Sequence, residues 1–148
     1  MQARSDIRVD HPELVRGRRV LVVEDGPTLT HGERSYVSGA IAAQACGAPE
    51  LVDPRPYAIG SLRACFERYP WIGRALPVEG YSAAQFAELQ ETIGRTPCDA
   101  VVVATPVNLS HVISIRQPCV RVTYTLVEIT RPDLAELADR FLDGSRPR

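Results

Sequence analysis

Runs of branched apolar residues alternate along the chain with segments in which apolar residues recur every three or four positions. The runs Val20–Val23 and Ala100–Ala104 contain no polar residue, which is typical of central strands of a parallel sheet that is buried on both faces. Residues 120–126 alternate between apolar and polar side chains, as a strand with one solvated face does. Leu51 and Val52 are expected to form a further short strand, which lies in the sequence between the two apolar runs.

The segments between these strands have helical spacing, and each starts at a residue that can cap a helix. Ser82 and Gln85 have the spacing of a capping box, in which each side chain closes an open amide of the first turn. The predicted helices, given by their first or capping residue and the residue that stops them, are His31 to Gly47, Ser61 to Pro70, Ser82 to Gly94, and Thr130 to Gly144.

Alternating strands and helices predict an α/β fold, namely a three-layer Rossmann-like domain with a mostly parallel sheet of about four to five strands. We expect a single domain over residues 19–143, a polar N-terminal tether over residues 1–18 and a polar tail over residues 144–148. The pattern leaves open whether residues 71–80 add an edge strand, and it does not determine the strand order.

The first strand ends in two adjacent acids and runs into a helix, which is where α/β proteins bind ligands. Thr30 and Glu33 have capping-box spacing, so we expect the helix to start at His31. The open amides of its first turn could then hold an anion. On this hypothesis, Glu24, Asp25 and His31 would be catalytic, and the two acids could also hold Mg²⁺. The residues that would bind the substrate are Gly26, Thr28, Thr30 and Gly32. The alternative is that these residues only cap a helix.

Polar residues also follow the other strands, and the carboxyl ends of parallel strands meet at one edge of a sheet. They are Asp53 and Arg55 after the second strand, Thr105 and Asn108 after the third, and Arg121 in the last. Arginine recognises phosphate or carboxylate groups with two parallel hydrogen bonds, so the set predicts a phosphorylated or carboxylated small-molecule ligand. In the alternative interpretation, Asp53 and Arg55 only fix a proline-rich turn.

Composition excludes several classes of function. The chain has 148 residues and a formal net charge of −1, which predicts neither nucleic-acid nor membrane binding. Its 4 cysteines lack C-x-x-C spacing and no signal peptide is recognisable, so we expect a cytoplasmic protein. All 17 basic residues other than histidine are arginine. Without lysine, the chain cannot provide the P-loop motif G-x-x-x-x-G-K-[ST] or form a Schiff base with a carbonyl substrate.

Several longer motifs resemble the C-terminal region of the cyclic 2,3-diphosphoglycerate synthetase family, also described as predicted P-loop GTPases. They are Val20 to Gly32, Val52 to Tyr57, and Thr105-Pro106, with shorter matches from about His11 to Phe141. The family's P-loop lies upstream of the matched region, and the synthetase uses ATP to close an intramolecular phosphoanhydride. The chain departs from the family pattern at Val37, where glycine is usual, at Trp71, where histidine is common, and at Asn108, where aspartate is common.

The resemblance implies that ATP or GTP and Mg²⁺ would be bound by a separate P-loop NTPase chain or a missing domain. This chain then holds no cofactor of its own and is no nucleotide hydrolase or ligase by itself. Two alternatives are a non-catalytic module that binds small anions or acts as a scaffold, and an independent small enzyme that uses acid–base chemistry. A homo-oligomer is compatible with each of these hypotheses.

Overall fold

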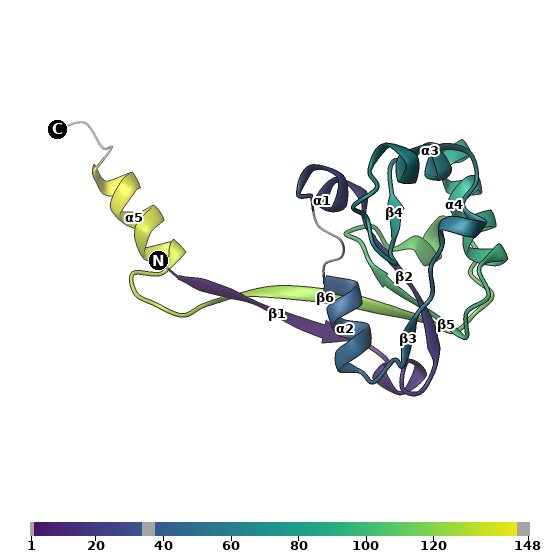
Figure 1. The fold of residues 1–148 in the computed structure, drawn as a ribbon. Helices are drawn as coiled ribbons and strands as arrows, with labels where there is room; N and C mark the ends of the chain where they lie inside the picture. The colour runs from purple at the N-terminus through teal and green to yellow at the C-terminus, as the bar shows by residue number, and fades with distance from the viewer. Residues whose placement is uncertain (1, 34–37, 145–148) are drawn as a thin grey trace. The chain divides into compact units, whose positions relative to one another are not determined.

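The computed structural model describes residues 2–33 and 38–144, and the chain divides into two compact units. The larger unit comprises Arg8–Thr123, and the smaller unit comprises Met1–Ile7 with Tyr124–Arg148. Figure 1 shows the order of the elements along the chain. No helix in the described residues is both long and apolar enough to cross a membrane.

The strands form a six-stranded, mostly parallel sheet. The strand order is β1-β6-β5-β2-β3, and β4 pairs with β2 beyond the end of β3. Strands β3, β4 and β5 each run parallel to β2, and β6 runs parallel to β5. The predicted α/β class and parallel sheet are therefore confirmed, and residues 71–80 do contribute a strand. The bounds are β1 Ala3–Val9, β2 Arg19–Asp25, β3 Glu50–Leu51, β4 Leu76–Val78, β5 Ala100–Ala104 and β6 Cys119–Glu128.

Among the described residues, the α-helices are α1 Gly26–His31, α2 Ser38–Ala45, α3 Gly60–Arg68, α4 Ala83–Arg95 and α5 Leu134–Gly144. Single-turn 3-10 helices lie at Pro12–Leu14, Arg55–Tyr57 and Leu109–His111. The predicted capping box at the start of α4 is confirmed, with Ser82 and Gln85 closing each other's amides. The cap predicted for α3 is wrong, because Ile59 is its N-cap residue and Glu88 of α4 accepts the N–H of Ser61 instead.

Strand β2 divides the core of the larger unit into two layers, because neighbouring side chains point to opposite faces of the sheet. Leu21 and Val23 pack with α1, α3 and α4 on one face. Val20 and Val22 pack with α2 on the other face. All four side chains are fully buried. Helices thus cover both faces of the sheet in this unit, as the three-layer expectation requires.

The smaller unit consists of the outer parts of β1 and β6 together with α5. Residues 1–18 were expected to be a tether, whereas Ala3–Val9 form β1 beside β6, and Ile129 N–H donates to the Gln2 carbonyl. The predicted cap of the last helix at Thr130 is also wrong. Asp133 and Glu136 form the capping contacts at 2.9 Å, and the Thr130 hydroxyl accepts from Gln2 N–H. Pro132 precedes the capping residue Asp133 and therefore lies outside the helix.

Candidate functional site

The loop after β2 forms a helix earlier than the sequence predicted. Helix α1 spans Gly26–His31 and has Asp25 as its N-cap residue, so Thr30 lies inside the helix and donates from its hydroxyl to the Gly26 carbonyl at 3.1 Å. Pro27 explains the shift, because proline has no N–H to lose and is favoured in the first helical turn. The predicted capping box of Thr30 and Glu33 is therefore wrong, and the open amides lie at the start of α1 instead.

Glu24 is buried in the larger unit, with 1% of its surface exposed. Its Oε1 accepts the backbone N–H of Gly39 at 2.8 Å and of Ala40 at 3.1 Å, at the start of α2. A carboxylate there closes open amides and neutralises the positive end of the helix. The glycine is required for this approach, since a Cβ at Gly39 would lie 2.8 Å from side-chain atoms of both Val22 and Ala104. Val37 lies outside the described residues.

The remaining side chains of the loop make local contacts. The Thr28 hydroxyl donates to Asp25 Oδ2 at 2.9 Å. His31 Nδ1 lies 3.0 Å from the Thr30 hydroxyl and 3.3 Å from the Pro27 carbonyl. Gly32 is the C-cap residue of α1. The three residues predicted to be catalytic therefore contact three different partners: Glu24 contacts the start of α2, Asp25 contacts Thr28, and His31 contacts Thr30.

The position of α1 is fixed from the loop after α3 and from β4. The Trp71 indole N–H donates to the Leu29 carbonyl at 3.1 Å, and the Trp71 ring meets Tyr69 edge to face. A Cβ at Gly26 would lie 2.3 Å from the Val78 carbonyl oxygen, so glycine allows α1 to contact the β4 backbone. Trp71 is therefore a packing residue of this loop.

Asp53 and Arg55 pair with each other after β3. The guanidinium of Arg55 donates to both carboxylate oxygens of Asp53, with Nε–Oδ1 at 2.9 Å and Nη2–Oδ2 at 2.7 Å. The Arg55 backbone N–H also donates to Oδ1 at 3.0 Å. This pair closes the turn that leads into the one-turn helix at Arg55–Tyr57. The contacts agree with the alternative interpretation, in which the two residues fix a proline-rich turn.

The Asp53→Asn substitution is expected to lower the free energy of unfolding slightly at neutral pH, by up to about 1 kcal/mol, because the pair is partly solvated. Arg55 holds the pKa of Asp53 below its ordinary value of 3.8. A lowered carboxyl pKa stabilises the fold above the unfolded pKa, and this contribution is lost as pH falls through the folded pKa. Urea unfolding at pH 7 and pH 3 measures it. The difference between the wild type and the variant should shrink at pH 3, and a pH-independent difference would contradict the ion-pair explanation.

A second group of predicted residues lies at the carboxyl end of β5, at the turn after it and beside the first residues of β6. A hollow of about 300 Å³, here called the β5–β6 hollow, is lined by Asp10, Val103, Asn108, Leu109, Ser110, Cys119 and Arg121. Residues Val103 and Arg121 are direct partners in the parallel pairing of the two strands. The hollow therefore has an apolar floor from the sheet and charged residues at its sides.

Arg121 supplies the positive charge of this hollow. Its Nη2 donates to the Pro106 carbonyl at 3.3 Å, which directs the guanidinium toward the turn after β5. Its Nε is buried and has no hydrogen-bond partner among the described residues. A buried donor without a partner is costly, so this group favours an acceptor from a ligand or from water.

The turn after β5 is arranged by its own hydrogen bonds. The Thr105 hydroxyl donates to the Val107 carbonyl at 2.7 Å. Asn108 Oδ1 accepts from the Ser110 hydroxyl at 2.8 Å and from its backbone N–H at 3.3 Å, which starts the one-turn helix at Leu109–His111. Thr105 therefore shapes the turn, whereas Asn108 and Ser110 line the hollow.

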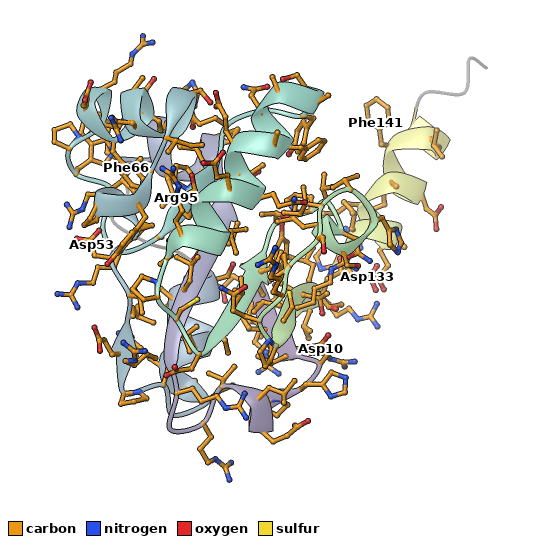
Figure 2. All side chains as sticks on the ribbon, turned by 90° about the vertical axis from the view of Figure 1, so that its right-hand side faces the viewer. Asp10, Asp53, Phe66, Arg95, Asp133 and Phe141 are labelled. Carbon is orange, nitrogen blue, oxygen red and sulfur yellow. The ribbon has the colours of Figure 1, made fainter. Side chains whose placement is uncertain are left out.

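The predicted site residues do not all meet in one place. Asp10 follows β1 and Asp53 follows β3, which lie at opposite ends of the strand order, and Figure 2 labels both side chains. Their contacts form separate groups around α1, around the turn after β3, and around the β5–β6 hollow. Strands β2, β3 and β5 run parallel, so their carboxyl ends point the same way, but each group forms hydrogen bonds within itself. Among the described residues, no group of three or more potential ligands could hold a metal ion.

Sequence reasoning missed Asp10 and Ser110 as residues of the hollow. Asp10 lies in the segment that was interpreted as a tether, and only the pairing of β1 with β6 places it beside Arg121. A run of alternating residues at 3–9 could have indicated the strand, but its polar content concealed it. Ser110 could have been found from the Asn-x-Ser spacing, which is typical of a side chain that caps a turn.

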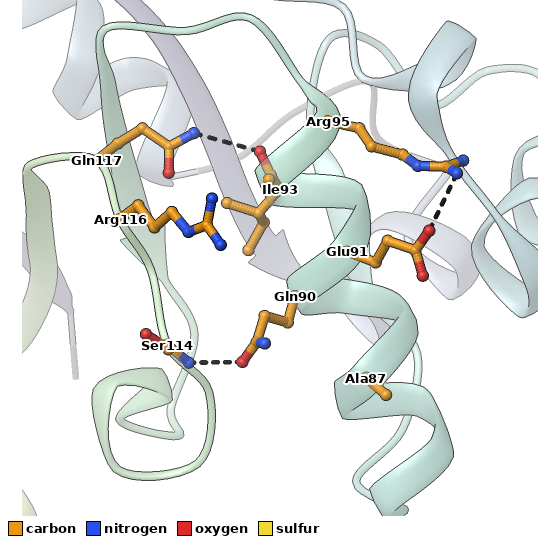
Figure 3. Close-up of a pocket in the computed structure, with 9 residues that line it drawn as sticks. Ala87, Gln90, Glu91, Ile93, Arg95, Ser114, Arg116 and Gln117 are labelled. Carbon is orange, nitrogen blue, oxygen red and sulfur yellow. Dashed lines mark hydrogen bonds and ion pairs between the residues drawn. The ribbon is translucent and has the colours of Figure 1, made fainter.

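A second hollow of about 470 Å³ lies between α4 and residues 114–117 (Figure 3). Gln90 Oε1 accepts the Ser114 N–H at 2.7 Å, and Gln117 Nε2 donates to the Ile93 carbonyl at 3.4 Å. Arg116 also lines this hollow, whereas Arg95 is paired with Glu91 at 3.0 Å. None of these residues was predicted as part of a site.

The fold and the β5–β6 hollow define a Rossmann-like α/β domain with an arginine-lined hollow at the carboxyl end of β5 and the start of β6. No protein-family model matches the chain, and no solved structure matches it. A curated relative, an arginine synthetase named ArcE from Thermococcus kodakarensis, is 48% identical over 141 residues. The match covers 95% of this chain but 32% of the relative, so the chain spans about a third of that protein's length.

Proposed function

We propose that this chain is the substrate-binding part of an ATP- or GTP-dependent synthetase, and that a polypeptide outside this chain binds the nucleotide. The similarity to about a third of an arginine synthetase carries the proposal. The absence of lysine supports it, because a P-loop needs a lysine for the β and γ phosphates. The link to the cyclic 2,3-diphosphoglycerate synthetase family stays a prediction, since the relative is named for arginine.

On this proposal, the β5–β6 hollow binds an anionic group of the substrate. Arg121 is its only lining residue with a positive charge at neutral pH among the described residues, and its buried Nε needs an acceptor. Arg55, the other predicted anion-binding arginine, already donates to both oxygens of Asp53. A ligand at Arg55 would have to displace that carboxylate, whereas Nε of Arg121 has no hydrogen-bond partner among the described residues.

Calorimetric titration of the chain with 2,3-diphosphoglycerate and with inorganic phosphate tests this proposal. We expect the Arg121→Gln variant to bind the better ligand about tenfold more weakly, because a charge-assisted hydrogen bond is lost. The matched variant Arg55→Gln should bind as the wild type does. Equal binding by the Arg121→Gln variant would remove the hollow from the site, and an Arg55-dependent signal would favour the turn after β3.

A second candidate function is a module that binds small anions or acts as a scaffold without catalysis. It is favoured because the acids predicted to be catalytic are engaged in structural contacts: Glu24 with the start of α2, and Asp25 with Thr28. The third hypothesis, an independent acid–base enzyme, needs Glu24, Asp25 and His31 to act on one substrate. Glu24 is buried and its Oε1 accepts two backbone amides, which favours the module over the independent enzyme.

A further inference from the structure

The β5–β6 hollow carries two opposite charges that do not pair with each other. Asp10 and Arg121 both line it, yet the ion pairs among the described residues do not include one between them. Oppositely charged side chains in one small hollow would attract each other. Their separation therefore has to come from other contacts that hold each side chain in place.

Those contacts are present on both sides of the hollow. Asp10 Oδ1 accepts the backbone N–H of Arg121 at 2.9 Å and of His11 at 2.8 Å, which anchors the carboxylate to the backbone of β6. The Arg121 guanidinium donates instead to the Pro106 carbonyl, at 3.3 Å, in the turn after β5. The anion is thus held close to the strand, and the cation is held at the turn after β5.

The carboxylate of Asp10 also affects the thiol of Cys119, which lines the hollow. Loss of hydration raises the pKa of the Cys119 thiol, and the negative charge of Asp10 raises it further. This effect needs the carboxylate to be near Cys119, which lines the same hollow. Asp10, Cys119 and Arg121 therefore border the same space.

We propose that the β5–β6 hollow binds the head group of an α-amino acid, with the ligand carboxylate on Arg121 and the ligand ammonium on Asp10. The proposal rests on the function proposed above and names its substrate class. An α-amino acid carries both charges on one carbon, so a single ligand satisfies both side chains. Its Cα and Cβ would lie on the apolar floor formed by Val103 and Leu109, and Ser110, whose hydroxyl donates to Asn108 Oδ1, also lines the hollow.

Simple anions are a poorer match to this arrangement. Phosphate or a plain carboxylate would satisfy Arg121 but would bring a negative charge toward Asp10, where like charges repel. A plain amine would satisfy Asp10 but leave the buried Nε of Arg121 without an acceptor. The hollow therefore favours a ligand that carries both a carboxylate and an ammonium group. A ligand with only one of them leaves a charge repelled or a buried donor without an acceptor.

Calorimetric titration of the 148-residue chain tests the proposal with L-arginine, agmatine and 5-guanidinopentanoate. Agmatine lacks the carboxylate of arginine, and 5-guanidinopentanoate lacks its amine. We expect L-arginine to bind and each analogue to bind about tenfold more weakly or not at all. L-Alanine is titrated as well, because it carries the head group alone and should compete with L-arginine at higher concentration.

Variants assign the two charges. Arg121→Gln should abolish the preference for L-arginine over agmatine, and Asp10→Asn should abolish the preference over 5-guanidinopentanoate. Asparagine keeps the side-chain oxygen that accepts the Arg121 N–H, so this variant is expected to fold, and its thermal unfolding checks that. Arg116→Gln, in the other hollow, is the matched control and should bind L-arginine as the wild type does.

The outcomes separate this proposal from the previous one. Binding of phosphate or 5-guanidinopentanoate as tight as that of L-arginine would overturn the amino-acid head group while leaving an anion-binding part of a synthetase in place. Unchanged binding of L-arginine by both hollow variants would overturn the site. Absence of binding by L-arginine, by phosphate and by 2,3-diphosphoglycerate would overturn both proposals.

Discussion

Replacing Glu24 with alanine is expected to lower the free energy of unfolding by about 3 kcal/mol, because two backbone amides lose a charged acceptor in a buried place. The affected amides are those of Gly39 and Ala40, at the first turn of α2. The side chain that disappears is 1% exposed, so water cannot easily take over these hydrogen bonds. Urea unfolding followed by circular dichroism measures the loss.

The adjacent acid provides the matched control for Glu24. Asp25 accepts one hydrogen bond from the Thr28 hydroxyl and is partly exposed, so Asp25→Ala should cost no more than about 1 kcal/mol. Glu24→Gln keeps an acceptor oxygen and should lie between the two. If Glu24→Ala were as stable as the wild type but failed to bind ligand, Glu24 would be a ligand-binding residue, as the sequence first suggested.

The Gly26→Ala substitution is expected to destabilise the larger unit by about 3 kcal/mol, because the added methyl group meets backbone that cannot move aside. A Cβ at Gly26 would lie 2.3 Å from the carbonyl oxygen of Val78 and 2.8 Å from its carbonyl carbon. Either α1 or β4 would have to shift, and both pack on the buried residues of β2. Thermal unfolding compared with the wild type measures the effect.

Gly94 is the matched control, because nothing lies within 4 Å of a Cβ at this position in α4. Gly94→Ala should raise the stability by up to about 1 kcal/mol, since alanine is the better helix former. The two alanine substitutions are therefore expected to act in opposite directions. A Gly26→Ala variant as stable as the wild type would show that α1 does not contact β4 in solution as it does here.

The fold class could be predicted because the buried strands carry their signal locally. Val20–Val23 and Ala100–Ala104 are apolar at every position, and only a sheet covered on both faces buries such runs. β1 was missed because its residues are mostly polar and exposed, and its evidence is its pairing with a strand more than a hundred residues away. Local patterns do not contain information of that kind.

The places where polar residues follow the strands could be read from the sequence for the same reason. A parallel sheet brings the carboxyl ends of its strands to one edge. Whether a side chain turns to a ligand or to its own backbone depends on contacts that a sequence does not display. Arg55 turns to Asp53, two residues away, whereas Arg121 reaches the Pro106 carbonyl and keeps a buried donor unused.

The absence of lysine has a consequence for experiments in solution. An amine-reactive dye would have the α-amino group of Met1 as its only primary amine in the 148-residue chain, and Met1 belongs to the smaller unit. The single tryptophan, Trp71, belongs to the larger unit. Energy transfer from Trp71 to such a dye would measure the separation of the two units in the wild-type sequence, without any substitution. Titrating a ligand into the labelled chain would then show whether binding in the larger unit changes that separation.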